Sequence, residues 1–382
     1  MAEERVNCDL LREIARQPDQ VSNRRIIDLA AKIRDWDALL QIGEKHYVLS
    51  LLSKRLAQVG TAVPPEARDR LQAAYEHNYV QCMANAAELI AVLRALDGEA
   101  IAAIPFKGVV LAVSAYGDLA ARPAGDLDIL IRFEDRTRAT AVLLARGYEL
   151  HTAIRPDGDP AAPNTFEYEL VRPGDGRLTE LRWRFDLAHP QFKRELEMDW
   201  ALPHRQTTVL AGARVPNLDP ELTLLTLCLH GSKHRWSRLI WICDVAQLLA
   251  SSPGLNWEFV LREARRTGLW RSVALGVLLA HRVAHADIPS FVLQRFESIG
   301  KVRKLAQYID ENLFDAPGWT PPGLLPYTVQ LLSFRDRIGF LLSPSLLQPN
   351  ERDYAILKLP RRLRGLYYLL RPFRILFDRS PR

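Results

Sequence analysis

Two aspartates spaced two residues apart are the sharpest chemical feature of the sequence. Asp126 and Asp128 lie in the segment GDLDILI at residues 125–131. In a β-strand alternate side chains share a face, so both carboxylates project together while the apolar residues face the core. Neighbouring carboxylates repel each other, and a hard cation such as Mg2+ (or Mn2+) relieves that repulsion. The pair predicts a metal site, although two incidental acids at a solvent-facing strand end would give the same tripeptide.

A second strand-like segment offers a third carboxylate. In residues 178–185 one face is apolar and the other carries Glu180, Arg182 and Arg184. Three acids on adjacent strands can hold two metal ions roughly 4 Å apart, one activating an attacking oxygen and one steadying a leaving pyrophosphate. We therefore predict Glu180 as the third catalytic and metal-binding carboxylate, with Glu169 on the preceding strand as the alternative. Glu169 would otherwise be a cross-strand partner of Arg182 or Arg184.

A Lys-Gly pair stands at a predicted strand-to-helix turn upstream of the acidic pair. Residues 105–108 read Pro-Phe-Lys-Gly. A glycine lets the backbone approach a phosphate closely, and a helix N-terminus presents free N–H groups to an anion. Lys107 and Gly108 are therefore predicted to hold the triphosphate of a nucleotide, with ordinary turn chemistry as the alternative. Arg122 is predicted to hold phosphate or to pair with an acid.

A basic cluster follows the predicted helix at residues 222–230. It consists of Lys233, His234, Arg235 and Arg238. Such a cluster could bind a triphosphate, and a network of helix caps and salt bridges explains it equally well. Asp244, on the next predicted helix, would orient Lys233 or serve as the base for an acceptor hydroxyl.

Two histidines in the same region have a spacing seen in zinc sites. His230 and His234 are four residues apart, which suits a metal ion if both lie on one helix. Gly231 argues against a continuous helix, and no glutamate follows His230 as the metalloprotease pattern requires. Packed or phosphate-contacting histidines are therefore predicted. A metal phosphohydrolase built around the two histidines and Asp244 stays open as a different function.

The apolar pattern places these residues in a small sheet between two helical regions. Apolar residues at helical spacing predict helices over residues 8–98, and short apolar runs predict strands from about residue 104. The predicted strands cover 104–106, 127–131, 166–171 and 178–185, and the predicted helices between them cover 109–116 and 135–146. The turn at 172–177 predicts a hairpin, and helices resume at Asp219-Pro220.

The expected fold class is therefore α+β, with a small mixed-sheet core flanked by helices. The predicted parts are an N-terminal helical region (1–98), an α/β core (99–215) and a C-terminal helical region with a basic tail (216–382).

The composition is that of an ordinary globular protein. Of 382 residues, 48% are hydrophobic and 25% charged, which argues against a disordered chain. No secretory signal pattern is seen, and no apolar run approaches the ~20 residues of a transmembrane helix, so we expect a cytoplasmic protein. The four cysteines form no Cys-x-x-Cys pair, which indicates neither a disulfide frame nor a zinc site.

Positive charge is concentrated in the tail. Residues 351–382 carry nine basic and three acidic side chains, and the net charge of the whole chain is +6. Such a stretch could contact a membrane or nucleic acid, although a solvated helical face is the commoner explanation. Because Pro372 interrupts residues 363–377, we interpret this segment as helices packed on the body.

Taken together, these motifs resemble the uncharacterised nucleotidyltransferase family, which is related to the DNA polymerase beta-like superfamily. The matching motifs are Pro105-Phe106-Lys107-Gly108, Tyr116, Arg122-Pro123, DLDIL at 126–130, Gly147-Tyr148, HGSKHRWSRLIWICD at 230–244, Leu359-Pro360 and LYYLLRP at 366–372. The resemblance implies a nucleotide-transfer core of a few strands and helices, flanked by helices, that uses magnesium and a nucleoside triphosphate (NTP), with ATP as the expected nucleotide.

The sequence departs from the family pattern at two points. The wider superfamily usually has Gly-Ser where this chain has Lys107-Gly108. Closer relatives often have an acid-x-His-Trp sequence, whereas residues 180–183 read Glu-Leu-Arg-Trp, so a histidine is missing from the third acidic strand.

The leading hypothesis is an enzyme that moves a nucleoside monophosphate from an NTP to a hydroxyl acceptor and releases pyrophosphate. The acceptor could be a protein side chain, a small molecule or an RNA end. The alternative is a catalytically inactive protein of the same fold that binds nucleotide or a partner. Besides the three acids, the predicted nucleotide-binding residues are Lys107, Gly108, Arg122, Lys233, His234, Arg238 and Asp244.

Overall fold

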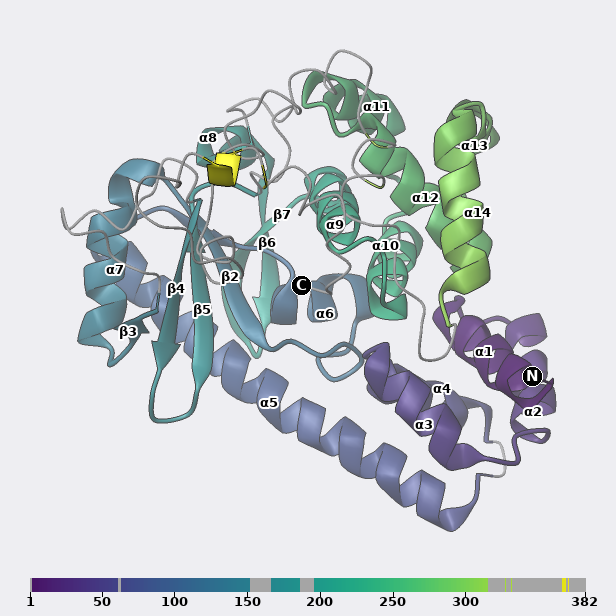
Figure 1. Cartoon of the computed structure of the whole chain (residues 1–382). Helices are drawn as coiled ribbons and strands as arrows, with labels where there is room; N and C mark the ends of the chain where they lie inside the picture. Colours follow the sequence, from purple (N-terminus) through teal and green to yellow (C-terminus); the bar gives the residue numbers. More distant parts are fainter. Residues whose placement is uncertain are drawn as a thin grey trace.

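The fold is α+β, as predicted, with a five-stranded sheet between two groups of helices along the chain (Figure 1). The computed structural model describes residues 2–60, 63–151, 166–185 and 196–314, together with residues 327, 331, 366–368 and 370. The predicted tail helices and the family motifs beyond residue 314 lie almost wholly outside the described residues. The predicted domain boundaries stay predictions.

In the described residues before the sheet, the chain forms five helices. They are α1 (Ala2–Ala15), α2 (Gln20–Ala30), α3 (Trp36–Lys45), α4 (Leu49–Val59) and α5 (Pro65–Gly98). Asp19 and Asp35 cap α2 and α3 by accepting backbone N–H groups. Helix α5 begins at a proline, which suits the first helical position, and its 34 residues span about 51 Å. It runs along α3 and α4 and then along the sheet (Figure 1).

The sheet holds the acidic strands at its centre. Its strands are β1 (Ala103–Pro105), β2 (Asp126–Ile131), β3 (Glu149–Leu150), β4 (Glu167–Arg172) and β5 (Arg177–Arg182), in the spatial order β1-β2-β5-β4-β3. Only β2 and β5 pair in parallel, and the other pairs are antiparallel. Helices α6 (Gly108–Tyr116) and α7 (Arg136–Ala145) connect the first strands, the latter after a short 3-10 turn, η1 (Phe133–Asp135). The predicted strand and helix order and the hairpin at 172–177 are confirmed.

A second, two-stranded sheet was not predicted. After the short helices α8 (Met198–Ala201) and η2 (Leu202–His204), β6 (Arg205–Leu210) and β7 (Ala213–Leu218) form an antiparallel hairpin. Its turn residues Ala211 and Gly212 both have positive φ, 46° and 81°, as a type I′ hairpin turn requires. The exposed polar strand β6 gives little alternating apolar signal, which explains why the sequence analysis missed it.

Between residues 219 and 314 the described chain forms six helices, and one prediction about them was wrong. They are α9 (Pro220–Lys233), α10 (Leu239–Ser251), α11 (Trp257–Arg266), α12 (Trp270–Ala284), α13 (Ser290–Glu297) and α14 (Gly300–Asn312). Helix α9 runs through Gly231 without a break, although the sequence analysis expected an interruption there. The reason for the glycine is packing, because a Cβ at this position would lie 2.4 Å from the buried ring of Trp236.

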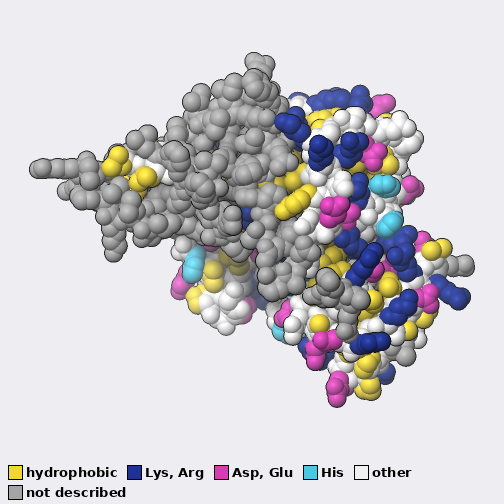
Figure 2. All heavy atoms as spheres, turned by 45° about the vertical axis from the view of Figure 1, so that its right-hand side comes forward, with side chains coloured by type: hydrophobic (Ala, Val, Ile, Leu, Met, Phe, Trp, Pro, Cys, Tyr) yellow, Lys and Arg dark blue, Asp and Glu magenta, His cyan; other side chains and the backbone are white. Residues whose placement is uncertain are grey.

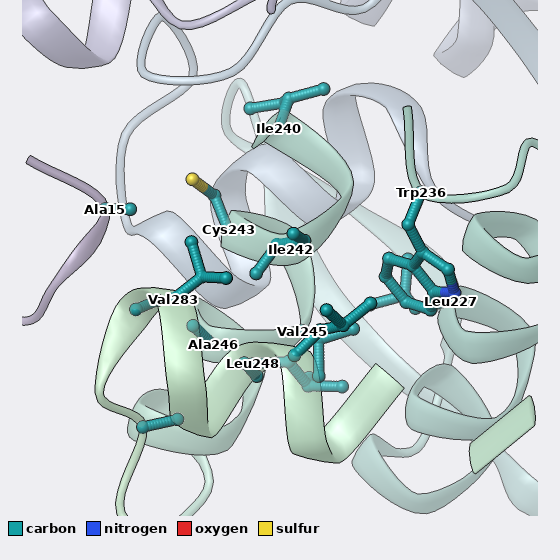
Figure 3. Close-up of a cluster of buried hydrophobic side chains, with 14 of the residues drawn as sticks. Ala15, Leu227, Trp236, Ile240, Ile242, Cys243, Val245, Ala246, Leu248 and Val283 are labelled. Atoms are coloured by element: carbon teal, nitrogen blue, oxygen red, sulfur yellow. The ribbon is translucent and has the colours of Figure 1, made fainter. Parts of the chain in front are cut away.

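The two helical groups, far apart in sequence, share a hydrophobic core. Side chains of α1 to α4 and of α9 to α14 belong to one buried cluster, which the start of α5 and a few sheet residues join. Most of the sheet, the rest of α5 and α7 bury another. In Figure 3, Ala15 of α1 lies beside Cys243 of α10 and Val283 of α12. The N-terminal helices are therefore fixed against the part of the chain that follows the sheet.

The visible surface carries both signs of charge. Figure 2 shows Lys and Arg side chains interspersed with Asp and Glu over the described part of one face. Within the described residues, no helix combines the length and the apolar character needed to cross a membrane.

Candidate active site

A cavity of about 720 Å³ lies between the acidic strands and the helices α9 and α10. This volume is in the range of pockets that hold small molecules. We call its carboxylate side the acidic wall, made of Asp126, Asp128, Glu167, Glu169 and Glu180. We call the facing side the basic wall, made of Tyr47, His230, Lys233, His234, Arg238 and Trp241. Lys107, Gly108 and Arg122 also line the cavity, so nine of the ten predicted site residues meet there; the exception is Asp244.

Strand pairing brings the three predicted carboxylates together. Strands β2 and β5 run in parallel with Asp128 opposite Glu180 and Asp126 opposite Leu178. Oxygen atoms of Asp126, Asp128 and Glu180 all lie within 4.8 Å of one another. The period of two along each strand thus places three acids on one face, as the alternation predicts.

The charges of these acids depend on their neighbours. Burial alone would raise the pKa of Asp128, but the Lys107 ammonium, 3.0 Å from Oδ2, and the Arg182 guanidinium, 3.1 Å from Oδ1, lower it to about 2. The charge of Asp128, followed by burial, raises the pKa of Asp126. Burial, followed by the charge of Asp128, raises the pKa of Glu180 to about 7. One acid is therefore held ionised, and the other two bind a proton more readily than ordinary carboxyl groups.

This donor set fits a hard divalent cation. All three groups offer carboxylate oxygens, which Mg2+ and Mn2+ prefer. The buried Oδ1 of Asp128 accepts no hydrogen bond, although Arg182 lies close enough for an ion pair. A cation among the three acids would also remove the repulsion that raises the pKa of Asp126.

A second group of carboxylates adjoins the first through Glu180. Glu167, Glu169 and Glu180 also offer oxygens within 4.8 Å of one another. Glu169 lies opposite Glu180 across the hairpin, and Glu167 lies opposite Arg182 and forms an ion pair with it at 2.7 Å. Arg182 thus pairs with Glu167, where the sequence analysis considered Glu169. Glu167 was missed, although it shares a strand face with Glu169 by the same period of two.

The Lys-Gly turn sits directly beside the acidic pair. Lys107 and Gly108 both have positive φ, 62° and 49°, and a Cβ on Gly108 would lie 3.4 Å from the carbonyl oxygen of Asp126. The left-handed glycine lets α6 begin close to β2. Besides its ion pair with Asp128, the Lys107 ammonium lies 3.5 Å from Nδ1 of His230, so it links the two walls.

Arg122 is fixed by Asp244, which does not line the cavity. The Arg122 Nε and Nη2 donate to the two carboxylate oxygens of Asp244 at 2.7 and 3.1 Å, and the Tyr116 hydroxyl donates to the same carboxylate at 2.7 Å. Arg122 and Asp244 are buried, and Tyr116 is partly buried. From the sequence, Asp244 was predicted to orient Lys233 or to act as a base. The structure instead pairs it with Arg122, because residue 244 faces α6 rather than the cavity.

Helix α5 holds the loop that carries Arg122. Asn78 Nδ2 donates to the carbonyl of Ala120 at 2.7 Å, and Asn85 Nδ2 donates to that of Ala124 at 2.6 Å. Asparagines seven residues apart lie on one face of a helix, and here they bond the loop leading into β2. Helix α5 therefore positions the acidic wall, and no motif in the sequence indicated this role.

The basic wall is a stack of rings and cations. The His230 and His234 ring centroids are 4.6 Å apart, and Trp241 stacks on His234 at 4.9 Å with 29° between the rings. Burial, followed by the charge of Lys107, lowers the pKa of His230 well below its usual value. The groups of side chains able to hold a metal contain only carboxylates among the described residues, so the phosphohydrolase alternative gains no support.

The comparison with protein families identifies the family. Residues 32–285 match the uncharacterised nucleotidyltransferase family. The chain belongs to this family. The matched range contains both walls of the cavity, including Tyr47. A comparison with curated proteins gives no match.

Several solved structures resemble this chain in part. The crystal structure of ANT(2″)-Ia in complex with adenylyl-2″-tobramycin is 15% identical, has a TM-score of 0.36, and is matched over 48% of this chain and 97% of that one. An antigenic nucleotidyltransferase-like protein from Paracoccidioides brasiliensis is 18% identical, with a TM-score of 0.28 over 52% of this chain and 91% of that one. These similarities are distant.

Proposed function

We propose that this nucleotidyltransferase is an enzyme that moves a nucleoside monophosphate from an NTP, with ATP as the expected nucleotide, to a hydroxyl acceptor. The observation that carries the proposal is the meeting of Asp126, Asp128 and Glu180, whose oxygens lie within 4.8 Å of one another at the cavity. Magnesium held by these residues would supply charge neutralisation at the reacting phosphate and activation of the attacking oxygen. Sharing of Glu180 with a second carboxylate group also suits a two-metal site.

The cationic residues around the cavity suit the triphosphate. Lys107, at the N-terminus of α6, would bind phosphate oxygens once a metal cation replaces it as the ion-pair partner of Asp128. Lys233 and His234 face the same cavity from the end of α9. Arg122, already oriented by Asp244, has further N–H groups for an anion. The leaving pyrophosphate would therefore stay among fixed positive charges.

A carboxylate of the acidic wall would accept the proton of the acceptor hydroxyl. Asp244 does not line the cavity and is bonded to Arg122 and Tyr116. Glu169 is exposed in the cavity and lies opposite Glu180; with a metal ion held by Asp126, Asp128 and Glu180 alone, the Glu169 carboxylate would accept the proton of an acceptor bound there. The acceptor itself can be a protein side chain, a small molecule or an RNA end. Contact of the tail with a membrane or nucleic acid concerns residues outside the described ones.

A binding protein without catalysis is the second candidate, and one observation favours it. Asp128 already pairs with both Lys107 and Arg182, so two protein cations compete with a metal ion for its oxygens. If a metal ion displaces neither Lys107 nor Arg182 from Asp128, nucleotide would bind without turnover.

The test is label transfer from each radiolabelled NTP, with magnesium or manganese, in a cell extract that supplies acceptors. Asp126→Ala/Asp128→Ala should abolish the transfer. Asp97→Ala/Glu99→Ala is the matched control, since these two acids have the same spacing but are exposed at the end of α5. Nucleotide binding without transfer in the wild type would favour the binding protein, and absence of nucleotide binding would refute both readings.

A further inference from the structure

The turn between α3 and α4 reaches the active site from the N-terminal helical region. Its residue His46 receives two backbone N–H groups from the first turn of α10. The N–H of Leu239 donates to His46 Nδ1 at 3.0 Å, and the N–H of Ile240 donates to the His46 carbonyl at 3.3 Å. Burial lowers the pKa of His46 to about 4, so Nδ1 is free of a proton and can accept. The start of α10 is thereby bonded to the turn and not open to a phosphate.

The next residue of that turn, Tyr47, is held in an unusual conformation. Its φ is 59°, in the left-handed region that a bulky residue rarely adopts. Its side chain is 44% exposed, so burial does not account for this backbone strain. Strained residues of this kind concentrate at binding sites, where the surrounding structure fixes them.

Tyr47 supports the guanidinium of Arg238. The Cζ of Arg238 lies 3.9 Å from the Tyr47 ring centroid and 5.5 Å from that of Trp241. Trp241 in turn stacks on His234. The guanidinium is therefore fixed by aromatic rings, and both Tyr47 and Arg238 line the cavity.

Arg238 differs from the other arginines that line the cavity. Arg122 is paired with Asp244, and Arg182 with three acids of the acidic wall. Arg238 forms no ion pair with a carboxylate anywhere in the described part of the chain. A planar guanidinium that is fixed in place and lacks an anion suits bidentate binding of phosphate or carboxylate oxygens.

We propose that Arg238 binds a phosphate group of a ligand in the cavity and that Tyr47 is the positioning residue that holds it for this purpose. The identity of the ligand rests on the proposed function, because the phosphate belongs either to the triphosphate of the donor nucleotide or to the acceptor. The N-terminal helical region thus completes the nucleotidyltransferase site through one turn.

Calorimetric titration of the full chain with pyrophosphate and with Mg-ATP tests the proposal. A lost charged hydrogen-bonding partner typically weakens binding by roughly ten- to a hundredfold, so we expect at least a tenfold loss in Tyr47→Ala and in Arg238→Ala. Tyr47→Phe keeps the ring and should restore most of the affinity lost in Tyr47→Ala. Arg238→Lys keeps only the charge and should restore part of it. Because Tyr47 acts through Arg238, the double variant should bind no more weakly than Arg238→Ala.

Tyr308→Ala is the matched control, since Tyr308 is 42% exposed on α14 and does not line the cavity. If the variants weaken the binding of both pyrophosphate and ATP, the phosphate bound by Arg238 is that of the donor nucleotide. If the variants weaken only the binding of inorganic phosphate, measured by titration into the ATP-saturated protein, the phosphate bound by Arg238 is that of the acceptor. Unchanged affinity for all three probes in Tyr47→Ala and Arg238→Ala overturns the proposal.

The two proposals fail separately. These titrations need no turnover. A wild-type protein that binds pyrophosphate through Arg238 but transfers no label would refute the proposed transferase activity and would still support the phosphate site at Arg238. Transfer that survives with unchanged KM for the nucleotide and unchanged phosphate binding in Tyr47→Ala refutes only the role of Tyr47.

Discussion

The acidic and basic walls of the cavity are built by the chain in different ways. The acidic wall comes from three neighbouring strands, and its acids stand two residues apart within β2 and within β4. The basic wall is assembled from the end of α9, the start of α10 and a turn nearly two hundred residues earlier. Local periodicity thus defines one wall, and tertiary packing defines the other.

The walls also differ in how their charges are balanced. On the acidic wall Asp128 is neutralised by Lys107 and Arg182 within the structure. On the basic wall Arg238 has aromatic neighbours but no carboxylate among the described residues. The first arrangement balances the charge of Asp128 within the protein, and the second leaves a positive charge for a ligand.

The largest effect is expected from the two strand aspartates, whose environments are opposite. Either Asp126→Asn or Asp128→Asn should reduce label transfer about a thousandfold, since a metal ion supplies several kcal/mol of transition-state stabilisation. Their stabilities should diverge. Asp128→Asn leaves Lys107 and Arg182 short of a partner and should lower the free energy of unfolding by about 3 kcal/mol.

Asp126→Asn removes the like charge beside Asp128 and should leave the free energy of unfolding unchanged or slightly higher. Urea denaturation of metal-free protein measures both values. An equal loss of stability in the two variants would mean that the charges of the acidic wall are not balanced as described.

A second effect concerns the ion pair between Arg122, in the loop before β2, and Asp244, on α10. Asp244→Ala leaves the buried guanidinium of Arg122 without its carboxylate, so the free energy of unfolding should fall by about 3–5 kcal/mol. Asp199→Ala breaks the exposed pair with Arg132, and such pairs contribute about 0–1 kcal/mol. Chemical denaturation compares the two, and similar losses would contradict the role given to Asp244.

This difference between the walls also explains what the sequence could predict. The strand alternation was enough to place Asp126, Asp128 and Glu180 on one face. The partner of Asp244 was not predictable, because the contact depends on how α10 packs against α6. Tyr47 carries no local signal at all, since its left-handed backbone and its contact with Arg238 arise only when the first helices dock on α10.

Gly231 provides a smaller test, on the basic wall. Alanine normally stabilises a helix relative to glycine by up to about 1 kcal/mol. In α9 the added Cβ would lie 2.4 Å from the Trp236 ring, so Gly231→Ala should instead cost about 1–3 kcal/mol and disturb His230 and His234. Gly98→Ala, in α5 with no neighbour within 4 Å, is the control. Thermal unfolding distinguishes them, and a stabilised Gly231→Ala variant would show that this close packing is not required.

The smallest effect is a pH dependence of metal binding at the acidic wall. The pKa of Glu180 is raised to about 7 by burial and by the charge of Asp128. Below pH 7 a bound cation must displace the proton of Glu180. Each pH unit in that range should therefore raise the Mg2+ or Mn2+ affinity by up to tenfold, and the affinity should level off above pH 7.

Manganese titration followed by electron paramagnetic resonance, from pH 5.5 to 8.5, measures this dependence. Glu180→Gln cannot carry the displaced proton, so its affinity should be lower at pH 8 and nearly flat through pH 7. Glu134→Gln, an exposed acid outside the cavity, should keep the wild-type profile. A wild-type profile that stays flat while Glu180→Gln still weakens binding would mean that Glu180 is ionised before the metal arrives. The positive charges of Lys107 and Arg182 would then dominate the whole acidic wall, rather than Asp128 alone.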